Sequence, residues 1–321
     1  MKDIGGYIEL ELQNGECLHK KAIALNSGRN CIRYIIRAYG IKELYAPIYE
    51  CPLVWDAIEA EGCKIKFYHI DKNLMPDCEF AEDDYILYSN YYGVCSENVK
   101  ILSKKYRNLI VDNAQSFFMK PTGFATVYSP RKFFGVTDGG YAYCNKQLDE
   151  NIEQDHDSYK RFSHLLKRIE FDSNEGYPDF KQNEHSLDNQ KIMKMSKLTS
   201  RLLSSGGGGY DSIIKSRTEN FNFLNRILGN YNLFKCEVKD EVPMFYPFLC
   251  ENTELRKYLH DNHIYVSTFW EGIEEKCSID SYEIYLKKYM YPLIIDQRYD
   301  IEDMKRQANL IKDFIENEKK V

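Results

Sequence analysis

The chain has 321 residues, of which 29% are charged and 43% hydrophobic, and its formal net charge is −6 at pH 7. At this length one hydrophobic core usually stops growing, so we expect a large domain with a smaller one attached. The mild acidic excess does not suggest the basic surface that nucleic-acid binding requires, so no nucleic-acid partner is expected.

The first residues, MKDIGGYIELELQNGECLHKK, contain no uninterrupted apolar stretch of the kind that a secretory signal needs. No later stretch approaches the ~20 apolar residues of a membrane span. These features predict a cytoplasmic protein without a membrane partner. The ten cysteines are scattered singly and form no CxxC pair, which favours reduced core cysteines over disulfides.

The N-terminal segment is expected to form a β-hairpin. Residues 6–12 alternate between apolar and polar, and Asn14-Gly15 is typical of a two-residue turn. Residues 17–25 would form the returning strand. A short polar turn, NSGRN at residues 26–30, follows.

Helices and strands then alternate. Ile32, Ile35, Ile36 and Tyr39 have helical spacing and predict a helix that ends at Gly40. The further helices are expected at 53–62 and 98–106, and the strands at 42–47, 64–71, 83–93 and 108–115. This order predicts an α/β fold with a mostly parallel central sheet flanked by helices.

The second half of the chain is more charged and helical. Residues 172–190 are polar and are expected to form a loop or mobile flap, and the glycines at 206–209 are expected to form a turn between two helices. A long helix at 213–229 would lead into a smaller α+β unit. We therefore predict a large domain within residues 1–215 and a small C-terminal domain within residues 216–321.

Unusual residues follow the predicted strands, where ligands bind in open α/β sheets. The turn at residues 26–30 runs directly into a helix, whose free N–H groups and dipole favour a phosphate, although Ser27-Gly28 can equally be an ordinary helix cap. Asp112 ends an apolar strand, where a carboxylate needs a cationic partner unless it caps a following helix.

The segment VYSPRKFFGV, residues 127–136, places Lys132 among aromatic and apolar residues. The amine of a buried lysine can act as a nucleophile in Schiff-base formation, whereas a surface lysine would have no such role. The adjacent Arg131 would either support a phosphate group or pair with an acid.

A phosphate turn, a strand-end acid and a buried lysine occur here in the order expected of a pyridoxal-phosphate enzyme. Along nearly the whole chain the motifs resemble the sugar aminotransferases of the DegT/StrS family, which have fold type I. The resemblance rests on Ser27-Gly28-Arg29, Pro47-Ile48-Tyr49, Tyr91-Tyr92-Gly93, Asp112-Asn113-Ala114-Gln115, Lys132 with Asp138-Gly139-Gly140, and YPLIID from residue 291.

This resemblance implies the cofactor and the roles of its site residues. Lys132 would hold pyridoxal 5'-phosphate covalently and act as the general acid and base, while Asp112 would pair with the ring nitrogen. Gln115 would lie beside the ring hydroxyl, and Tyr49, or alternatively Tyr91, would stack on the ring. The phosphate would be held by Ser27, Gly28, Arg29 and Ser129. The resemblance also implies a homodimer with shared active sites.

The expected reaction is amino transfer from a donor such as glutamate to a keto sugar, nucleotide-linked, in polysaccharide or related biosynthesis. A pyridoxal-phosphate lyase or decarboxylase on the same fold is an alternative. A non-catalytic scaffold is another, because the family usually has threonine at Arg29 and an aromatic residue near Cys51. No metal site is expected, since His260 and His263 lack a third ligand.

Overall fold

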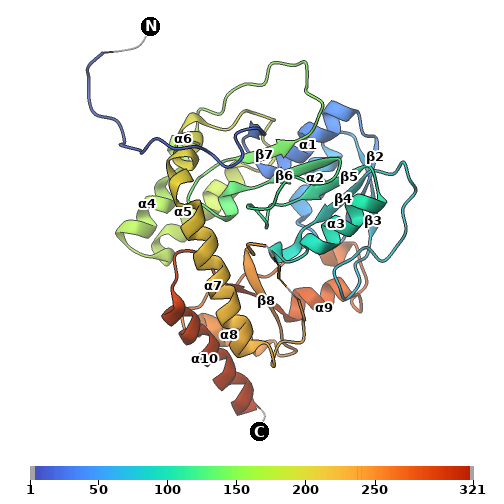
Figure 1. Ribbon diagram of the computed structural model, residues 1–321, viewed down its shortest axis with the longest axis vertical. Coiled ribbons are helices and arrows are strands. Elements are labelled where there is room, and N and C mark those ends of the chain that lie inside the picture. The colour runs from blue at the N-terminus through green and yellow to red at the C-terminus, as the bar shows by residue number, and fades with distance from the viewer. Residues whose placement is uncertain (1–3, 237, 240, 319–321) are drawn as a thin grey trace.

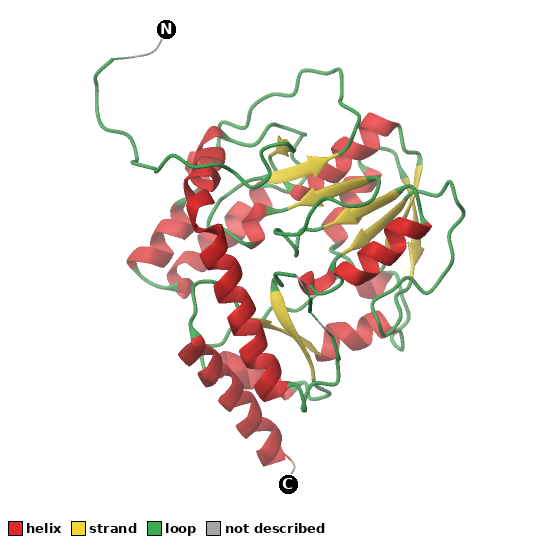
Figure 2. Ribbon diagram, viewed as in Figure 1, coloured by secondary structure: helices red, strands yellow, loops and turns green. Residues whose placement is uncertain are grey.

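The computed structural model of the protein describes residues 4–236, 238–239 and 241–318 (Figure 1). The protein contains a large sheet and a two-stranded sheet (Figure 2). The strands of the large sheet are β1 Ile23–Leu25, β2 Glu43–Pro47, β3 Lys64–Tyr68, β4 Ile86–Ser89, β5 Leu109–Asp112, β6 Ala125–Tyr128 and β7 Gly140–Tyr143. Their order is β1-β7-β6-β5-β4-β2-β3.

The large sheet is mostly parallel. Strands β3, β2, β4, β5 and β6 run in one direction, β7 is antiparallel to β6, and β1 is antiparallel to β7. Strand β1 therefore runs in the same direction as the five parallel strands, and the carboxyl ends of these six strands lie at one edge of the sheet. The predicted α/β architecture is confirmed.

Helices cover both faces of this sheet. Helices α1 Gly28–Tyr39 and α2 Pro52–Glu59 share one core cluster with Leu87 and Ile110, whereas α3 Ser96–Lys105 shares another with Ile86 and Val111. Because alternate residues of a strand point to opposite faces, β4 and β5 are apolar on both sides. Helix α1 ends where predicted, at Gly40, whose φ of 66° lies in the left-handed region.

The C-terminal part is built on the antiparallel pair β8 Phe245–Leu249 and β9 Met290–Ile294. Helix α7 Tyr210–Leu228 runs down to it from the large sheet, and α10 Ile301–Glu318 lies beside α7 (Figure 1). Helices α8 Glu254–Asp261 and α9 Tyr282–Tyr289 complete this part. One hydrophobic cluster includes residues of both sheets, so the division near residue 216 stays a prediction.

The expected N-terminal hairpin is wrong. Residues 4–22 contain no strand, and the first strand is β1, which pairs with β7. The alternating segment is exposed: Ile8 is 86% and Leu10 67% accessible to solvent. Alternation specifies the two faces of a strand but not its partner, and an isolated hairpin is at best marginally stable.

The expected flap is also wrong, because residues 173–186 form helix α5 Ser173–Ser186. Asp172 caps it by accepting hydrogen bonds from the N–H groups of Asn174 and Glu175 at 2.8 and 3.0 Å. It packs against α4 Ser163–Glu170 as a helical hairpin. The glycines at 206–209 join α6 Lys197–Ser205 to α7 through a 3-10 turn, as expected of a connection between two helices.

All ten cysteines are free thiols, as the sequence predicts. Cys31, Cys63 and Cys95 are buried in the core, as predicted, whereas Cys78 is exposed. Over the described residues, no helix combines the length and the apolar character that crossing a membrane requires. The same residues contain no group of three side chains placed to bind a metal ion.

Candidate active site

Two buried carboxyl groups lie at the carboxyl edge of the large sheet. Asp112 ends β5 and is 8% exposed, and Glu50, which follows β2, is 4% exposed. Ser89, at the end of β4, is in register with Asp112, and its hydroxyl donates a hydrogen bond to Glu50. Three adjacent parallel strands therefore bring these side chains together.

Lys132 lies in a 3-10 turn, Pro130–Lys132, that follows β6. Burial raises the pKa values of Asp112 and Glu50, and the positive charge of Lys132 opposes this effect at both groups. The expectation that Lys132 is buried is wrong, because its side chain is exposed and Phe133 takes the buried position beside it. Successive residues of a tight turn point in different directions, so the flanking aromatic residues do not enclose the lysine.

Asp112 has an incomplete set of partners. Its Oδ1 accepts a hydrogen bond from the Ala114 N–H at 2.7 Å, and within the described chain its Oδ2 accepts none. Burial raises the pKa of Asp112, while the charge of Lys132 and the Ala114 N–H oppose this effect. No helix follows β5, so Asp112 is not a helix cap, but its hydrogen bond from the Ala114 N–H caps the turn that follows the strand.

The turn before α1 lies against the segment that follows Lys132. Ser27 caps α1, accepting a hydrogen bond from the Asn30 N–H at 3.1 Å. The Gly139 N–H donates to the Asn26 carbonyl at 2.8 Å, and a Cβ on Gly28 would lie 3.6 Å from the Cβ of Ser129. The structure thus brings Ser27, Gly28 and Ser129 together.

Asp138 holds the segment that follows Lys132 in place. It is fully buried and accepts hydrogen bonds from the Ser196 N–H and hydroxyl, each at 2.8 Å, and from the Ser158 hydroxyl at 2.9 Å. The Thr199 hydroxyl also donates to it. The acid of the Asp-Gly-Gly motif is therefore a structural connection between the lysine segment and the start of α6.

Both arginines of the site motifs pair with acids near the C-terminal end of α5. Arg29 Nη1 is 2.8 Å from Asp188 Oδ1, and Arg29 Nη2 donates to the Leu187 carbonyl at 3.3 Å. Arg131 pairs with Glu184, so of its two predicted roles the structure shows pairing with an acid. Burial and the charge of Arg29 lower the pKa of Arg131 to about 10.

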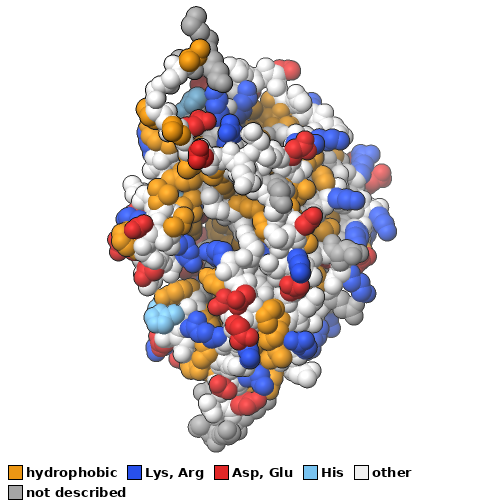
Figure 3. Space-filling view, turned by 60° about the vertical axis from the view of Figure 1, so that its left-hand side comes forward, with side chains coloured by type: hydrophobic (Ala, Val, Ile, Leu, Met, Phe, Trp, Pro, Cys, Tyr) orange, Lys and Arg blue, Asp and Glu red, His pale blue; other side chains and the backbone are white. Residues whose placement is uncertain are grey.

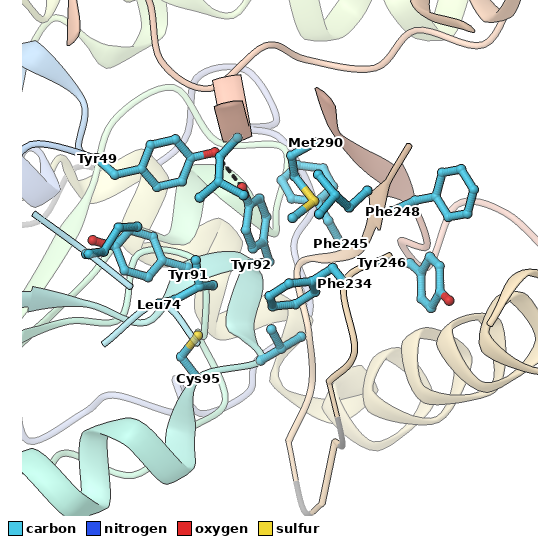
Figure 4. Close-up of a cluster of buried hydrophobic side chains, with 14 of the residues drawn as sticks. Tyr49, Leu74, Tyr91, Tyr92, Cys95, Phe234, Phe245, Tyr246, Phe248 and Met290 are labelled. Carbon is cyan, nitrogen blue, oxygen red and sulfur yellow. Dashed lines mark hydrogen bonds between the residues drawn. The ribbon is translucent and has the colours of Figure 1, made fainter. Parts of the chain in front are cut away.

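Tyr49 belongs to an aromatic cluster between the two sheets (Figure 4). It is fully buried, its hydroxyl is 2.6 Å from that of Tyr92, and its ring centroid lies 4.8 Å from that of Trp270. The stacking role of Tyr49 stays a prediction. Tyr91 is also fully buried, and no described residue is a hydrogen-bond partner of its hydroxyl.

Gln115 fixes the turn that follows β4. Its Oε1 accepts a hydrogen bond from the Tyr92 N–H at 2.8 Å, and Tyr92 has a positive φ of 57°. A Cβ on Gly93 would lie 2.4 Å from the Gln115 carbonyl oxygen, so this position requires glycine. The Gln115 Nε2 donates no hydrogen bond to the described residues.

Glu50 is the site residue that sequence reasoning missed. It directly follows the Pro-Ile-Tyr motif at the end of a strand, the same kind of position that singled out Asp112. Burial and the negative charge of Asp112 raise the pKa of Glu50 to about 7, while the Ser89 hydroxyl, the Cys51 N–H and Lys132 oppose this effect. Its signal in the sequence was an acid at the carboxyl end of β2.

No family model and no curated protein matches the chain in sequence. Solved structures match its fold. A DegT DnrJ EryC1 StrS aminotransferase from Brucella abortus is 13% identical, with a TM-score of 0.65 over 91% of this chain and 85% of that one. PseC of Helicobacter pylori, an aminotransferase involved in pseudoaminic acid biosynthesis, is 14% identical, with a TM-score of 0.62 over 92% of this chain and 87% of PseC.

A sugar aminotransferase from Streptococcus pneumoniae, in its pyridoxal-phosphate form, is 13% identical, with a TM-score of 0.63 over 91% of this chain and 87% of that one. At such identities the similarity shows the fold alone. The chain has the fold type I architecture of these aminotransferases, as the sequence predicts. The motif resemblance and the structural similarity agree on this fold.

Proposed function

We propose that the protein is a pyridoxal-phosphate-dependent aminotransferase that acts on a sugar. The observation that carries this proposal is the buried Asp112 at the carboxyl edge of the sheet, on which the charge of Lys132 acts. Structures of the S. pneumoniae sugar aminotransferase in pyridoxal-phosphate and pyridoxamine-phosphate forms support it, because they have the same fold.

The residues of the site fit pyridoxal phosphate. The free Oδ2 of Asp112 can accept a hydrogen bond from a protonated ring nitrogen, which would be the cation that this buried carboxylate needs. The first turn of α1, a helix of 12 residues, presents backbone N–H groups to a phosphate. The turn is held against the segment that follows Lys132, because Gly139 and Gly140 lie against Asn26 and Ser27.

Pyridoxal phosphate, when bound, supplies a ring that withdraws electrons from the carbon that carries the amino group. Lys132 would bind it covalently and then move a proton to and from that carbon as general acid and base. Asp112 would keep a proton on the ring nitrogen. The Gln115 Nε2 would donate a hydrogen bond to the ring hydroxyl.

The phosphate would be held by Ser27, Gly28 and Ser129. Arg29 would contribute its backbone N–H group, because Asp188 and the Leu187 carbonyl already bind its guanidinium. The substrate would be a keto sugar, nucleotide-linked, with glutamate as an amino donor, and the pathway polysaccharide or related biosynthesis. The biosynthetic role in the name of PseC supports this direction.

We also propose that the protein is a homodimer. The helical hairpin α4–α5 exposes large hydrophobic side chains, and Figure 3 shows such side chains on that side of the molecule. Ile169 is 83%, Phe171 66% and Leu166 61% exposed. An apolar surface of this kind is typical of an interface between protein chains.

The test is spectroscopic. The protein purified with pyridoxal phosphate should show the visible absorbance band of the lysine-bound cofactor, and glutamate should convert the cofactor to pyridoxamine phosphate. Lys132→Ala should abolish the band, whereas Lys120→Ala, which removes an exposed lysine elsewhere, should keep it. A band without conversion by any amino donor would favour a lyase or decarboxylase, and no band in the unaltered protein would favour a scaffold.

A further inference from the structure

A hydrogen bond joins the C-terminal part of the protein to the turn that carries Lys132. The Gln297 Nε2 donates to the Phe133 carbonyl at 2.8 Å. Gln297 lies three residues after β9, in the part built on the two-stranded sheet, whereas Phe133 directly follows Lys132. The contact therefore spans 164 residues of sequence and ends one residue beyond the lysine.

Arg217, on α7, holds the Gln297 amide in this orientation. The Arg217 Nε donates to the Gln297 Oε1 at 2.9 Å. Because a guanidinium only donates and a carbonyl only accepts, the amide has one orientation that satisfies both of its partners. The guanidinium also lies over the Phe133 ring, with 4.5 Å between its central carbon and the ring centroid, where a cation is attracted to the aromatic face. Arg217 thus acts on Phe133 both directly and through Gln297.

The position of Arg217 is itself fixed. Its side chain is buried, at 1% exposure, and its Nη1 donates to the carbonyl groups of Pro243 and Met244, just before β8, at 3.3 and 3.2 Å. Burial lowers the pKa of Arg217 to about 10, while the charge of Asp296 opposes this effect, so the side chain is a cation at neutral pH. A guanidinium bound to three acceptors has little freedom to turn away from Gln297.

The turn that carries Lys132 is short. Among the described residues, the backbone N–H groups of Phe133 and Phe134 both donate to the Pro130 carbonyl, at 3.0 and 2.9 Å. These bonds close a single 3-10 turn that no helix continues. They fix the shape of the turn but not its place relative to the C-terminal part. The hydrogen bond from Gln297 supplies that second restraint.

We propose that Gln297 is a positioning residue for Lys132. Together with Arg217 it holds the Phe133 carbonyl from the C-terminal part and so sets where the turn presents the lysine. This inference rests on the proposed function, because the lysine that is positioned would be the one that binds the cofactor. It also gives a role to the YPLIID segment, residues 291–296, which leads from β9 directly to Gln297.

Hydrogen exchange measured without pyridoxal phosphate tests the positioning itself. Gln297→Glu keeps an acceptor for Arg217 but replaces the donor to the Phe133 carbonyl by a charged oxygen, which repels it. The backbone N–H groups of residues 130–137 should then exchange at least about fivefold faster, because the turn opens more easily. Gln297→Met removes both hydrogen bonds at a similar side-chain length and should act in the same direction.

Two outcomes of this measurement would overturn the proposal. The first is unchanged exchange of residues 130–137 in both variants. The second is faster exchange in Gln297→Met alone, because the effect would then come from the lost contact with Arg217 and not from the Phe133 carbonyl.

Gln307 is a matched control in the same part of the protein. It is 3% exposed, its Nε2 donates to the Ile294 carbonyl at 3.0 Å, and its Oε1 accepts from the Ile294 N–H at 3.3 Å. Gln307→Glu makes the same chemical change at a side chain that binds β9 instead of the lysine turn. It should leave the exchange of residues 130–137 unchanged. Equally fast exchange of that segment in Gln307→Glu and Gln297→Glu would show a general loosening and would also overturn the proposal.

The protein loaded with pyridoxal phosphate supplies a separate readout. In Gln297→Glu the maximal rate of cofactor conversion by glutamate should fall about tenfold, because the lysine is displaced from its working position. The glutamate concentration that gives half of this rate should change little, and Gln307→Glu should keep both values. A raised glutamate requirement at an unchanged maximal rate would place Gln297 in substrate binding and overturn the proposal. If the unaltered protein forms no visible band, the proposed function fails, and the exchange measurement still decides whether Gln297 holds the turn.

Discussion

Gly140 packs directly onto the backbone of Ser27. A Cβ atom at position 140 would lie 2.4 Å from both the carbonyl carbon and the carbonyl oxygen of Ser27, and 2.7 Å from the Gly28 nitrogen. Non-bonded atoms do not approach so closely in packed proteins, so a side chain here would push the turn before α1 away from β7. The second glycine of the Asp-Gly-Gly motif therefore sets the distance between the proposed phosphate site and the lysine segment.

We predict that Gly140→Ala lowers the free energy of unfolding by about 1–3 kcal/mol, the usual cost of forcing extra atoms into a packed site. It should also weaken pyridoxal-phosphate binding at least tenfold, or about 1.4 kcal/mol, because the turn is displaced. Urea unfolding and titration of the visible band measure the two effects.

Gly135→Ala is the matched control for this change. Its Cβ would meet only Leu165 Cδ2, at 3.6 Å, which is an ordinary contact. This variant should bind the cofactor normally and unfold close to the original midpoint. Equal behaviour of the two variants would contradict the prediction.

Asp138→Asn should destabilise the protein without changing its shape. The buried carboxylate accepts four hydrogen bonds, from Ser158, Ser196 and Thr199, and an amide would turn one acceptor into a donor that faces another donor. We expect a loss of about 2–4 kcal/mol in unfolding free energy, measured in urea.

Asp149→Asn is the control for Asp138, because it makes the same chemical change at an exposed position. It should alter the unfolding free energy by less than about 0.5 kcal/mol. If Asp138→Asn unfolded at the same urea concentration as this control, the anchoring role of Asp138 would be wrong.

The sequence predicts the sheet and its helices well because their signals are local. Helix α1 and its end at Gly40 follow from apolar spacing and one glycine, and the strands follow from short apolar runs between turns. It was also predictable that the segments after β1, β5 and β6, which carry Ser27, Asp112 and Lys132, lie at one edge of the sheet. Parallel strands place their carboxyl ends at one edge, so residues that are far apart in sequence meet there.

Contacts that depend on tertiary structure could not be predicted. Arg29 finds Asp188 at a separation of 159 residues, and nothing near either residue indicates the other. Helix α5 was missed for a different reason: its polar composition suggested a loop, although Asp172 and Glu175 have the spacing of a helix start. The alternation at residues 6–12 misled because it carries no information about a partner strand.

His19 should make stability depend on pH. Its ring is 4% exposed, with Nε2 2.9 Å from the Phe117 carbonyl and Nδ1 3.2 Å from the Tyr143 hydroxyl. Burial lowers its pKa to about 4, so the folded protein holds it neutral, whereas the unfolded chain protonates it below about pH 6.5. Between these values the unfolded state binds more protons, so stability falls as the pH falls, by up to about 1.4 kcal/mol per pH unit.

The check is urea unfolding at several pH values between 4 and 7, with His19→Gln beside the unaltered protein. The unfolding free energy of His19→Gln should lack the part of the pH dependence that His19 causes. It should differ least from that of the unaltered protein at low pH. His156→Gln, at an exposed position, should keep the original slope. Parallel stability curves for His19→Gln and the unaltered protein would contradict the assignment.

Arg29 should matter more for stability than for cofactor binding. Its guanidinium and the Asp188 carboxylate are 18% and 24% exposed as side chains, and their 2.8 Å contact joins the first turn of α1 to the end of α5. Arg29→Gln removes the charge, keeps a polar side chain and leaves the backbone N–H in place. We expect a loss of about 1–3 kcal/mol in unfolding free energy, between the values for exposed and fully buried pairs. The dissociation constant for pyridoxal phosphate should change by less than about threefold, or 0.7 kcal/mol.

Ser129→Ala makes the opposite comparison, because the Ser129 hydroxyl has no hydrogen-bond partner among the described residues and is free for the phosphate. It should weaken cofactor binding with little effect on unfolding. If instead Arg29→Gln weakened binding tenfold or more at unchanged stability, the guanidinium would leave Asp188 for the phosphate, and the role assigned here to its backbone alone would be wrong.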